Sequence, residues 1–175
     1  MSSISDSKIR QSALVFYEED IEALETVLDA FLKKSAAKCA LLVDKDGHMI
    51  TARGATKSVD LDTISALVAG SFAATRALAH QFGEQDFTAL FHQGKSGNIQ
   101  LSLVGDRALL TALFDDHTTV GMVRLYATEA AQRLTAVFRK KQETAASGTG
   151  PARAGVDGKA FTDGTTGALD SVFGS

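Results

Sequence analysis

The chain has 175 residues, of which 45% are hydrophobic and 22% charged, and this size and balance suit one globular domain with a substantial core. The formal net charge is -3 and the pI about 5.8. These values argue against a binder of duplex nucleic acid, since such proteins usually carry a basic stripe. No apolar run approaches the roughly 18 residues that a membrane-spanning helix requires.

The N-terminal residues MSSISDSKIRQ lack the apolar core of a secretion signal. A single cysteine, Cys39, excludes an internal disulfide framework and a CxxC metal site. Cys39 opens an apolar stretch, where we expect it to be a small buried hydrophobe. We therefore expect a cytoplasmic protein.

Residues 1–14 are polar and are expected to be loose, and a helix and a hairpin are predicted after them. Apolar residues recur at helical spacing through Glu18–Ala36, with acids in the first turn and lysines in the last, as the helix dipole favours. Cys39–Val43 is continuously apolar, like a strand buried on both faces, and returns as His48–Arg53. The connecting Asp44–Gly47 faintly resembles a calcium loop, but the downstream ligands are missing, so a tight turn is favoured.

The stretch Leu61–Phe82 predicts a helix with two different apolar faces, capped by Asp60 or Asp62 and ended by Gly83. The face expected to anchor in the core holds the large residues Leu61, Ile64, Leu67, Val68, Phe72, Leu78 and Phe82. The opposite face holds the small residues Ala66, Ala69, Gly70, Ala73, Ala74 and Ala77. Small residues let another backbone approach closely, and a mid-helix glycine costs about 1 kcal/mol relative to alanine. This face therefore suits either a helix sandwiched inside one monomer or a subunit interface.

Three strands are expected next, over Phe87–Gln93, Asn98–Val104 and Arg107–Phe114. The middle strand alternates polar and apolar residues, so one of its faces is expected to be wet, whereas the last strand is apolar throughout and is expected to lie centrally. A final amphipathic helix is expected over Thr118–Lys141. The preceding Asp115–His117 resembles a metal or acid–base cluster, but the favoured interpretation is an N-terminal cap and dipole partners for that helix.

The composition changes after the last predicted helix. Residues 142–160 are rich in Ala, Gly, Ser and Thr around the only proline, which is typical of a flexible linker. We therefore place one domain at residues 15–141 and a short C-terminal motif at residues 161–175. The apolar residues of this motif are Phe161, Leu169, Val172 and Phe173. The motif is either disordered or a segment that folds on a partner.

Motifs that carry enzyme chemistry are absent from the sequence. There is no GxxxxGK[ST] phosphate loop, no GxGxxG after a strand, no HExxH and no GxSxG. The four histidines lie in different predicted elements without metal-ligand spacing: His48, His80, His92 and His117. We therefore predict no catalytic residue, no metal site, no cofactor and no chemistry by this chain alone.

Several separate segments, in the right order, resemble the roadblock family of dynein-light-chain-like domains. The resemblance runs from about Val15 to Arg139 through YEED, LLVDKDG, LVAGSFAAT, FHQG and the start of the last helix. Within the family the MglB-like proteins, which are partners of the Ras-like GTPase MglA, are the most similar. The resemblance implies an α+β fold of order α-β-β-α-β-β-β-α, with a five-stranded antiparallel sheet. The second helix is expected on one face and the first and last helices on the other.

The resemblance also implies two interfaces. Roadblock proteins pair through the second helix and the edge of the third strand, which here corresponds to a homodimer interface at Ala66, Ala74, Phe87, Ala89 and Phe91. In MglB-like proteins the paired helices bind the GTPase in its GTP-bound form. The matching positions here are Ala69, Gly70, Ala73, Arg76, Ala77 and His80.

MglB-like proteins stimulate GTP hydrolysis by remodelling the switch regions of the GTPase without inserting an arginine finger. The resemblance therefore implies a GTPase-activating regulator in cell polarity or motility, concentrated at a cell pole. The arginines that could be proposed as a finger are better explained by ordinary surface pairing: Arg53, Arg76, Arg107 and Arg124. A non-catalytic scaffold or adaptor is the alternative, since roadblock domains also serve in that way. A small-molecule sensor is weaker because no polar pocket is evident in the sequence.

Overall fold

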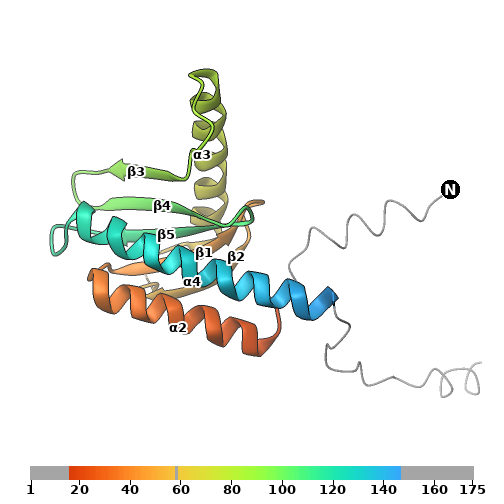
Figure 1. The fold of residues 1–175 in the computed structure, drawn as a ribbon. Coiled ribbons are helices and arrows are strands. Elements are labelled where there is room, and N and C mark those ends of the chain that lie inside the picture. The colour runs from red at the N-terminus through yellow and green to blue at the C-terminus, as the bar shows by residue number, and fades with distance from the viewer. Residues whose placement is uncertain (1–15, 58, 147–175) are drawn as a thin grey trace, which may run out of the picture. The chain divides into compact units, whose positions relative to one another are not determined.

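The computed structural model describes residues 16–57 and 59–146 (Figure 1). The predicted loose segment 1–14, the linker beyond residue 146 and the C-terminal motif with Phe161, Leu169, Val172 and Phe173 lie outside the described residues. The elements are α2 (Glu18–Ser35), β1 (Cys39–Asp44), β2 (Met49–Gly54), α3 (Leu61–Gln81), β3 (Ala89–Gln93), β4 (Asn98–Val104), β5 (Ala108–Phe114) and α4 (Val120–Ala146).

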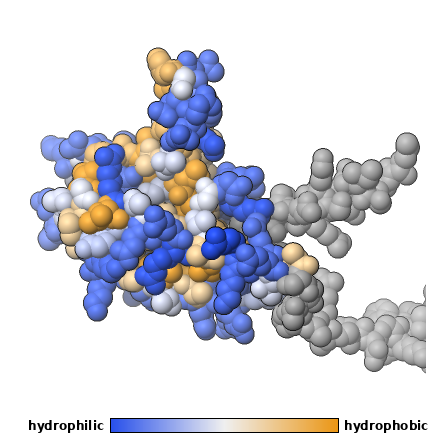
Figure 2. Space-filling model, in the orientation of Figure 1, coloured by the Kyte–Doolittle hydropathy of each residue, from blue (hydrophilic) through white to orange (hydrophobic). Residues whose placement is uncertain are grey.

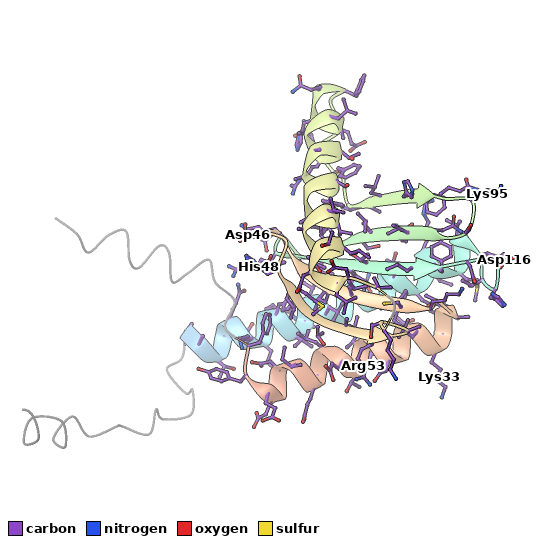
Figure 3. The ribbon with its side chains drawn as sticks, turned by 180° about the vertical axis from the view of Figure 1, so that it is seen from behind. Lys33, Asp46, His48, Arg53, Lys95 and Asp116 are labelled. Carbon is purple, nitrogen blue, oxygen red and sulfur yellow. The ribbon has the colours of Figure 1, made fainter. Side chains whose placement is uncertain are left out.

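The five strands form one antiparallel sheet in the order β2-β1-β5-β4-β3. Helices α2 and α4 lie on one face of the sheet and α3 lies on the other (Figures 1 and 3). The predicted fold class and element order are therefore confirmed. Helix α4 is longer than predicted, since it continues past Lys141 into the segment that the composition assigned to a linker.

The continuous apolar runs of β1 and β5 follow from helices on both faces of the sheet. In β1, Ala40 and Leu42 pack toward α2 and α4, whereas Leu41 and Val43 belong to the cluster beneath α3, and all four are fully buried. Cys39 is also buried, as expected of a small hydrophobe. Strand β5 lies at the centre of the sheet, which confirms its predicted place.

The prediction that one face of β4 is wet is wrong. Gln100 is only 1% exposed, because its neighbours across the sheet, Phe91 and Ala112, contribute to the core beneath α2 and α4. Its side-chain nitrogen donates to the carbonyl of Leu101 at 3.0 Å. On this face of β4 the middle residue is therefore a buried amide, and its polar neighbours Asn98 and Ser102 are only partly exposed.

Helix α3 crosses the sheet and continues beyond its β3 edge (Figures 1 and 3). Its 21 residues make a helix about 31 Å long, whereas five strands span only about 19 Å. Its buried residues, Ser65, Val68, Ala69 and Phe72, all lie in the first 12 residues of the helix. The C-terminal part of α3 therefore has no sheet beneath it.

This geometry corrects the predicted division of α3 into two faces. Leu67 is 64% exposed, Leu78 56% and Phe82 82%, although all three were expected to anchor in the core. Ala69, which was assigned to the outward small face, is buried. The remaining small residues, Ala66, Gly70, Ala73, Ala74 and Ala77, are exposed as expected.

The predicted turn at Asp44–Gly47 joins β1 and β2 and packs against α3 (Figure 3). One carboxylate oxygen of Asp44 accepts from the backbone N–H groups of Asp46 at 2.9 Å and His48 at 2.8 Å, which closes the turn. Gly47 has φ 93°, and a Cβ there would lie 3.1 Å from the Cα of Ala66. Gly47 and Ala66 therefore lie close together, and the small side chain of Ala66 is explained by this contact between the turn and α3.

Replacement of Gly54 by alanine is expected to destabilise the domain strongly. Gly54 has φ 95°, and an added Cβ would lie 2.4 Å from the carbonyl oxygen of Lys38. The left-handed backbone alone costs about 1–3 kcal/mol for a residue with a side chain, and the clash adds to it. Thermal unfolding of Gly54→Ala should show a clearly lowered midpoint.

The matched control is Gly121→Ala in α4. A Cβ at Gly121 would meet only the Thr119 hydroxyl oxygen at 3.9 Å, an ordinary contact, and its φ is not positive. Its midpoint should stay the same or rise slightly, since alanine favours helices. Equal midpoints for the two variants would contradict the argument.

Candidate partner-binding site

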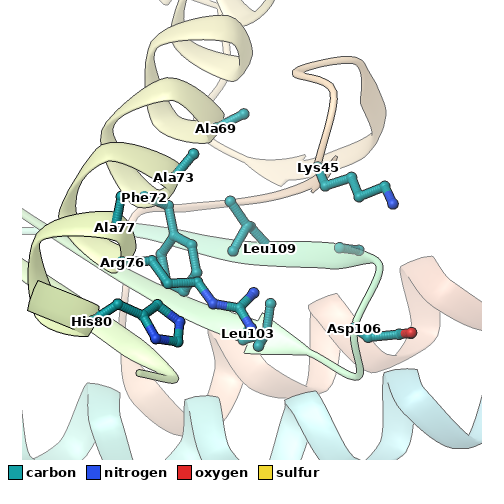
Figure 4. A pocket seen from close by; sticks show the side chains of 11 residues that line it. Lys45, Ala69, Phe72, Ala73, Arg76, Ala77, His80, Leu103, Asp106 and Leu109 are labelled. Atoms are coloured by element: carbon teal, nitrogen blue, oxygen red, sulfur yellow. The ribbon is translucent and has the colours of Figure 1, made fainter. Parts of the chain in front are cut away.

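A groove of about 310 Å³ runs between the exposed half of α3 and the two nearby turns of the sheet (Figure 4). Lys45 of the β1–β2 turn and Asp106 of the β4–β5 turn line one side. Its apolar floor comes from Phe72, Leu103 and Leu109. The α3 side is formed by Ala69, Ala73, Arg76, Ala77 and His80. We call this surface the α3 groove.

Five of the six residues predicted to bind a GTPase therefore line one surface. Gly70 is the exception, since it lies on another face of α3. The sequence identified the helix side of the α3 groove but missed its opposite side. Lys45 carries no signal in the sequence, because only the sheet topology brings the β1–β2 turn beside α3.

The two turns that form the wall of the α3 groove are joined to each other. The backbone N–H of Lys45 donates to the carbonyl of Arg107 at 3.2 Å. On the helix side, the ring of Phe72 packs against that of Phe87, with 5.1 Å between the ring centroids. The turn wall and the apolar floor of the groove are therefore held by contacts within the domain before any partner arrives.

The α3 groove carries more positive than negative charge, although the whole chain is acidic. Lys45 and Arg76 line it, and neither side chain has an ion-pair partner among residues 16–57 and 59–146. The one acid, Asp106, lies 3.7 Å from the Nε of Arg107. Small alanines between these groups leave room for a partner backbone to come close.

A second exposed face of α3 consists of Leu67, Gly70, Ala74 and Leu78, which we call the outer stripe. Residues three, seven and eleven positions apart lie along one side of a helix. A Cβ added to Gly70 would have no other atom of residues 16–57 and 59–146 within 4 Å, so no contact among these residues explains the glycine. Hydrophobic surface is visible toward the tip of the projecting helix (Figure 2).

Strand β3 forms an edge of the sheet beside this helix. On one side it pairs with β4, and no described strand pairs with its other side. Ala89 is exposed, whereas Phe87 packs on Phe72 and Phe91 stacks on Phe114 with 6.2 Å between centroids. An unpaired edge of this kind is a natural place for another strand to add.

The Asp115–His117 segment is a turn that does not cap α4, so that prediction is wrong. Asp115 accepts from the backbone N–H of His117 at 3.2 Å, and the cap position is taken by Thr119, whose hydroxyl accepts from Met122 at 3.3 Å. The Lys38 ammonium and the His117 ring, in that order, hold the pKa of the Asp115 carboxyl well below its usual range. The cluster is accounted for by these internal pairs.

The four arginines considered as fingers differ in their surroundings. Arg53 makes two hydrogen bonds to Asp29, at 2.8 and 2.9 Å, and this carboxylate raises the pKa of its guanidinium. Arg107 lies beside Asp106. Arg124 is exposed on α4, on the opposite face of the sheet from the α3 groove. Only Arg76 lines the groove.

Comparisons with known proteins support one family. A Roadblock/LC7 domain model matches residues 23–114, from within α2 to the end of β5. The chain belongs to the Roadblock/LC7 domain family. The matched region of this roadblock chain contains all of α3 and every residue of the α3 groove.

Solved structures of MglB proteins are similar to this roadblock chain. MglB of Myxococcus xanthus is 37% identical, with a TM-score of 0.68, over 73% of this chain and 96% of that one. The gliding protein MglB of Thermus thermophilus is 34% identical, with a TM-score of 0.69, over 73% and 97%. An uncharacterized protein of Methanocaldococcus jannaschii is 25% identical over 66% of this chain and 99% of its own length. The resemblance to the roadblock family and its MglB members is thereby confirmed.

No helix among the described residues combines the length and the apolar character that a membrane span needs.

Proposed function

We propose that this roadblock protein is a homodimeric regulator that stimulates GTP hydrolysis by an MglA-like Ras-family GTPase. The observation that carries the proposal is a single helix, α3, which projects past the edge of its own sheet and has two exposed faces. The identity of 34–37% to MglB proteins over nearly their whole length supports the choice of partner. The outer stripe is assigned to the second copy of the chain and the α3 groove to the GTPase.

Pairing with a second copy is supported by the free energy that would be gained by burying the exposed leucines of the outer stripe. Leu67 and Leu78 are large and more than half exposed, and burying such a side chain contributes on the order of 1.5–3 kcal/mol. Gly70 between them costs helix stability, about 1 kcal/mol, and leaves room for a neighbouring backbone. A partner helix packed along the outer stripe would bury Leu67 and Leu78 and approach closely at Gly70. Pairing of β3 with the same strand of the partner would satisfy the open edge of the sheet.

Two residues, Gly70 and Ala66, have a different proposed role from the one expected from the sequence. Gly70 was expected to contact the GTPase, but it lies on the outer stripe with Ala74 and is proposed at the dimer interface instead. Ala66, expected at that interface, lies against Gly47 of the β1–β2 turn. Ala69, Ala73, Arg76, Ala77 and His80 keep their proposed role toward the GTPase.

The proposed mechanism needs no catalytic group from this protein. Hydrolysis of GTP requires a positioned water and charge stabilisation at the γ-phosphate, and on this proposal the GTPase supplies both. The regulator binds the switch conformation in which these groups are in place and so increases its population. Differential affinity for that conformation is the source of the activation.

The deciding experiment is a single-turnover hydrolysis assay with a GTP-loaded MglA-like GTPase. The regulator is expected to raise the rate about tenfold or more, which corresponds to about 1.4 kcal/mol off the barrier. The GTPase alone provides the reference rate. Binding without acceleration would favour the alternative of a non-catalytic scaffold, and absence of binding would refute the proposal.

A further inference from the structure

We propose that the α3 groove binds a segment of the GTPase that carries a carboxylate next to an apolar side chain. The carboxylate would lie between Lys45 and Arg76, and the apolar side chain on Leu103 and Leu109. This inference rests on the proposed function, and it names the chemistry by which the groove selects its partner. It also gives Arg76 a docking role rather than a role at the nucleotide.

The first argument is that the two cations are unpaired in a chain with more acids than bases. The sequence has 21 acidic residues against 18 Lys and Arg. Some other described cations are paired: Lys34 with Glu129, Lys141 with Asp20 and Arg53 with Asp29. Among residues 16–57 and 59–146, Lys33 and Arg124 also lack an ion pair, but neither of them lines the groove. Lys45 and Arg76 have none among the described residues, so an anion from outside is the complement that the groove lacks.

The second argument is the surface next to these cations. Leu109 is 3% exposed and Phe72 4%, so the floor of the groove is apolar and firmly packed. A charge pair that closes over an apolar floor is partly shielded from water, which strengthens it relative to a pair at an open surface. Figure 4 shows the Arg76 side chain extending from α3 across this floor toward Leu103.

The third argument is that the shape of the groove suits an extended chain rather than a compact ligand. The hydrogen bond from the backbone N–H of Lys45 to the carbonyl of Arg107 fixes the β1–β2 turn. On the helix side, the short side chains of Ala73 and Ala77 leave space for a backbone. A backbone can therefore run along α3 while one side chain enters the groove. Opposite charges arranged in this way mainly fix the register and accelerate association.

The test is to reverse each charge and measure affinity for the GTPase loaded with a non-hydrolysable GTP analogue. Arg76→Glu and Lys45→Glu are each expected to weaken binding about tenfold and to flatten its salt dependence. Arg76→Lys should stay within about threefold of wild type, because it keeps the charge. The matched control is Arg124→Glu, an exposed helical arginine on the other face of the sheet, which should bind like wild type.

A hydrolysis measurement separates docking from catalysis. Arg76→Ala should raise the regulator concentration needed for half-maximal stimulation about tenfold, and any loss of maximal rate at saturation should stay far below the roughly 10³-fold or more that loss of an arginine finger costs. A large loss of maximal rate would overturn the inference. So would unchanged affinity and salt dependence in both charge reversals while wild type binds, and this result would leave the proposed function intact. Failure of wild type to bind would overturn both.

Discussion

Replacing Ala73 by arginine is expected to return GTP hydrolysis to the intrinsic rate of the GTPase. Ala73 is exposed on α3 and lines the groove beside Arg76. The longer side chain would fill the space left for the partner and would add a third cation next to Lys45 and Arg76. Like charges at an interface cost several kcal/mol, so affinity should fall by about 100-fold or more.

The control for this substitution is Ala136→Arg. Ala136 is an exposed helical alanine in α4, on the opposite face of the sheet, so the chemical change is the same and only the place differs. Circular dichroism should show both variants folded, since neither residue is buried. Stimulation by Ala73→Arg at the wild-type level would mean that the GTPase binds elsewhere.

The double variant Leu67→Glu, Leu78→Glu is expected to dissociate the dimer into folded monomers. These leucines of the outer stripe are 64% and 56% exposed, so their replacement removes little from the core of the subunit. At an interface, the loss of two apolar side chains at about 1.5–3 kcal/mol each should raise the dissociation constant by about 100-fold or more. Sedimentation over a range of concentrations measures it.

The matched control is Met122→Glu, Leu125→Glu on α4. These two residues are also large and exposed, at 42% and 62%, but they lie on the other side of the sheet. This variant should sediment like wild type. If both double variants remained dimeric, the outer stripe would not be the contact between copies.

The sequence predicted the elements of this fold well because its local signals agree with its tertiary structure. The apolar run of β5 placed it at the centre of the sheet, and Asp60 was one of two predicted caps, with Thr63 as its backbone donor at 3.2 Å. Glycines with positive φ mark the turns at Gly47 and Gly105. Hydrophobic periodicity, helix caps and turn glycines all depend on residues that are close in the sequence, so they can be recognised without the structure.

What the sequence could not predict depends on the path of α3 across the sheet. A helical pattern treats every large residue on one face as equivalent, yet Phe72 has strands beneath it and Leu78 does not. Similarly, Lys45 enters the site only because the strand order brings its turn beside the helix. Both facts require distances between elements, which one sequence does not contain.

The part of α3 beyond the sheet also bears on how the binding surface comes into being. Short isolated helices are marginal in water, so in a lone subunit the amide hydrogens after Phe72 should exchange rapidly with solvent. Ala73, Arg76 and Ala77 lie in that part, and contact with a second copy would order it. The concentration of the regulator would then determine the fraction of its subunits that are paired, and with it the number of ordered binding sites for the GTPase in a cell.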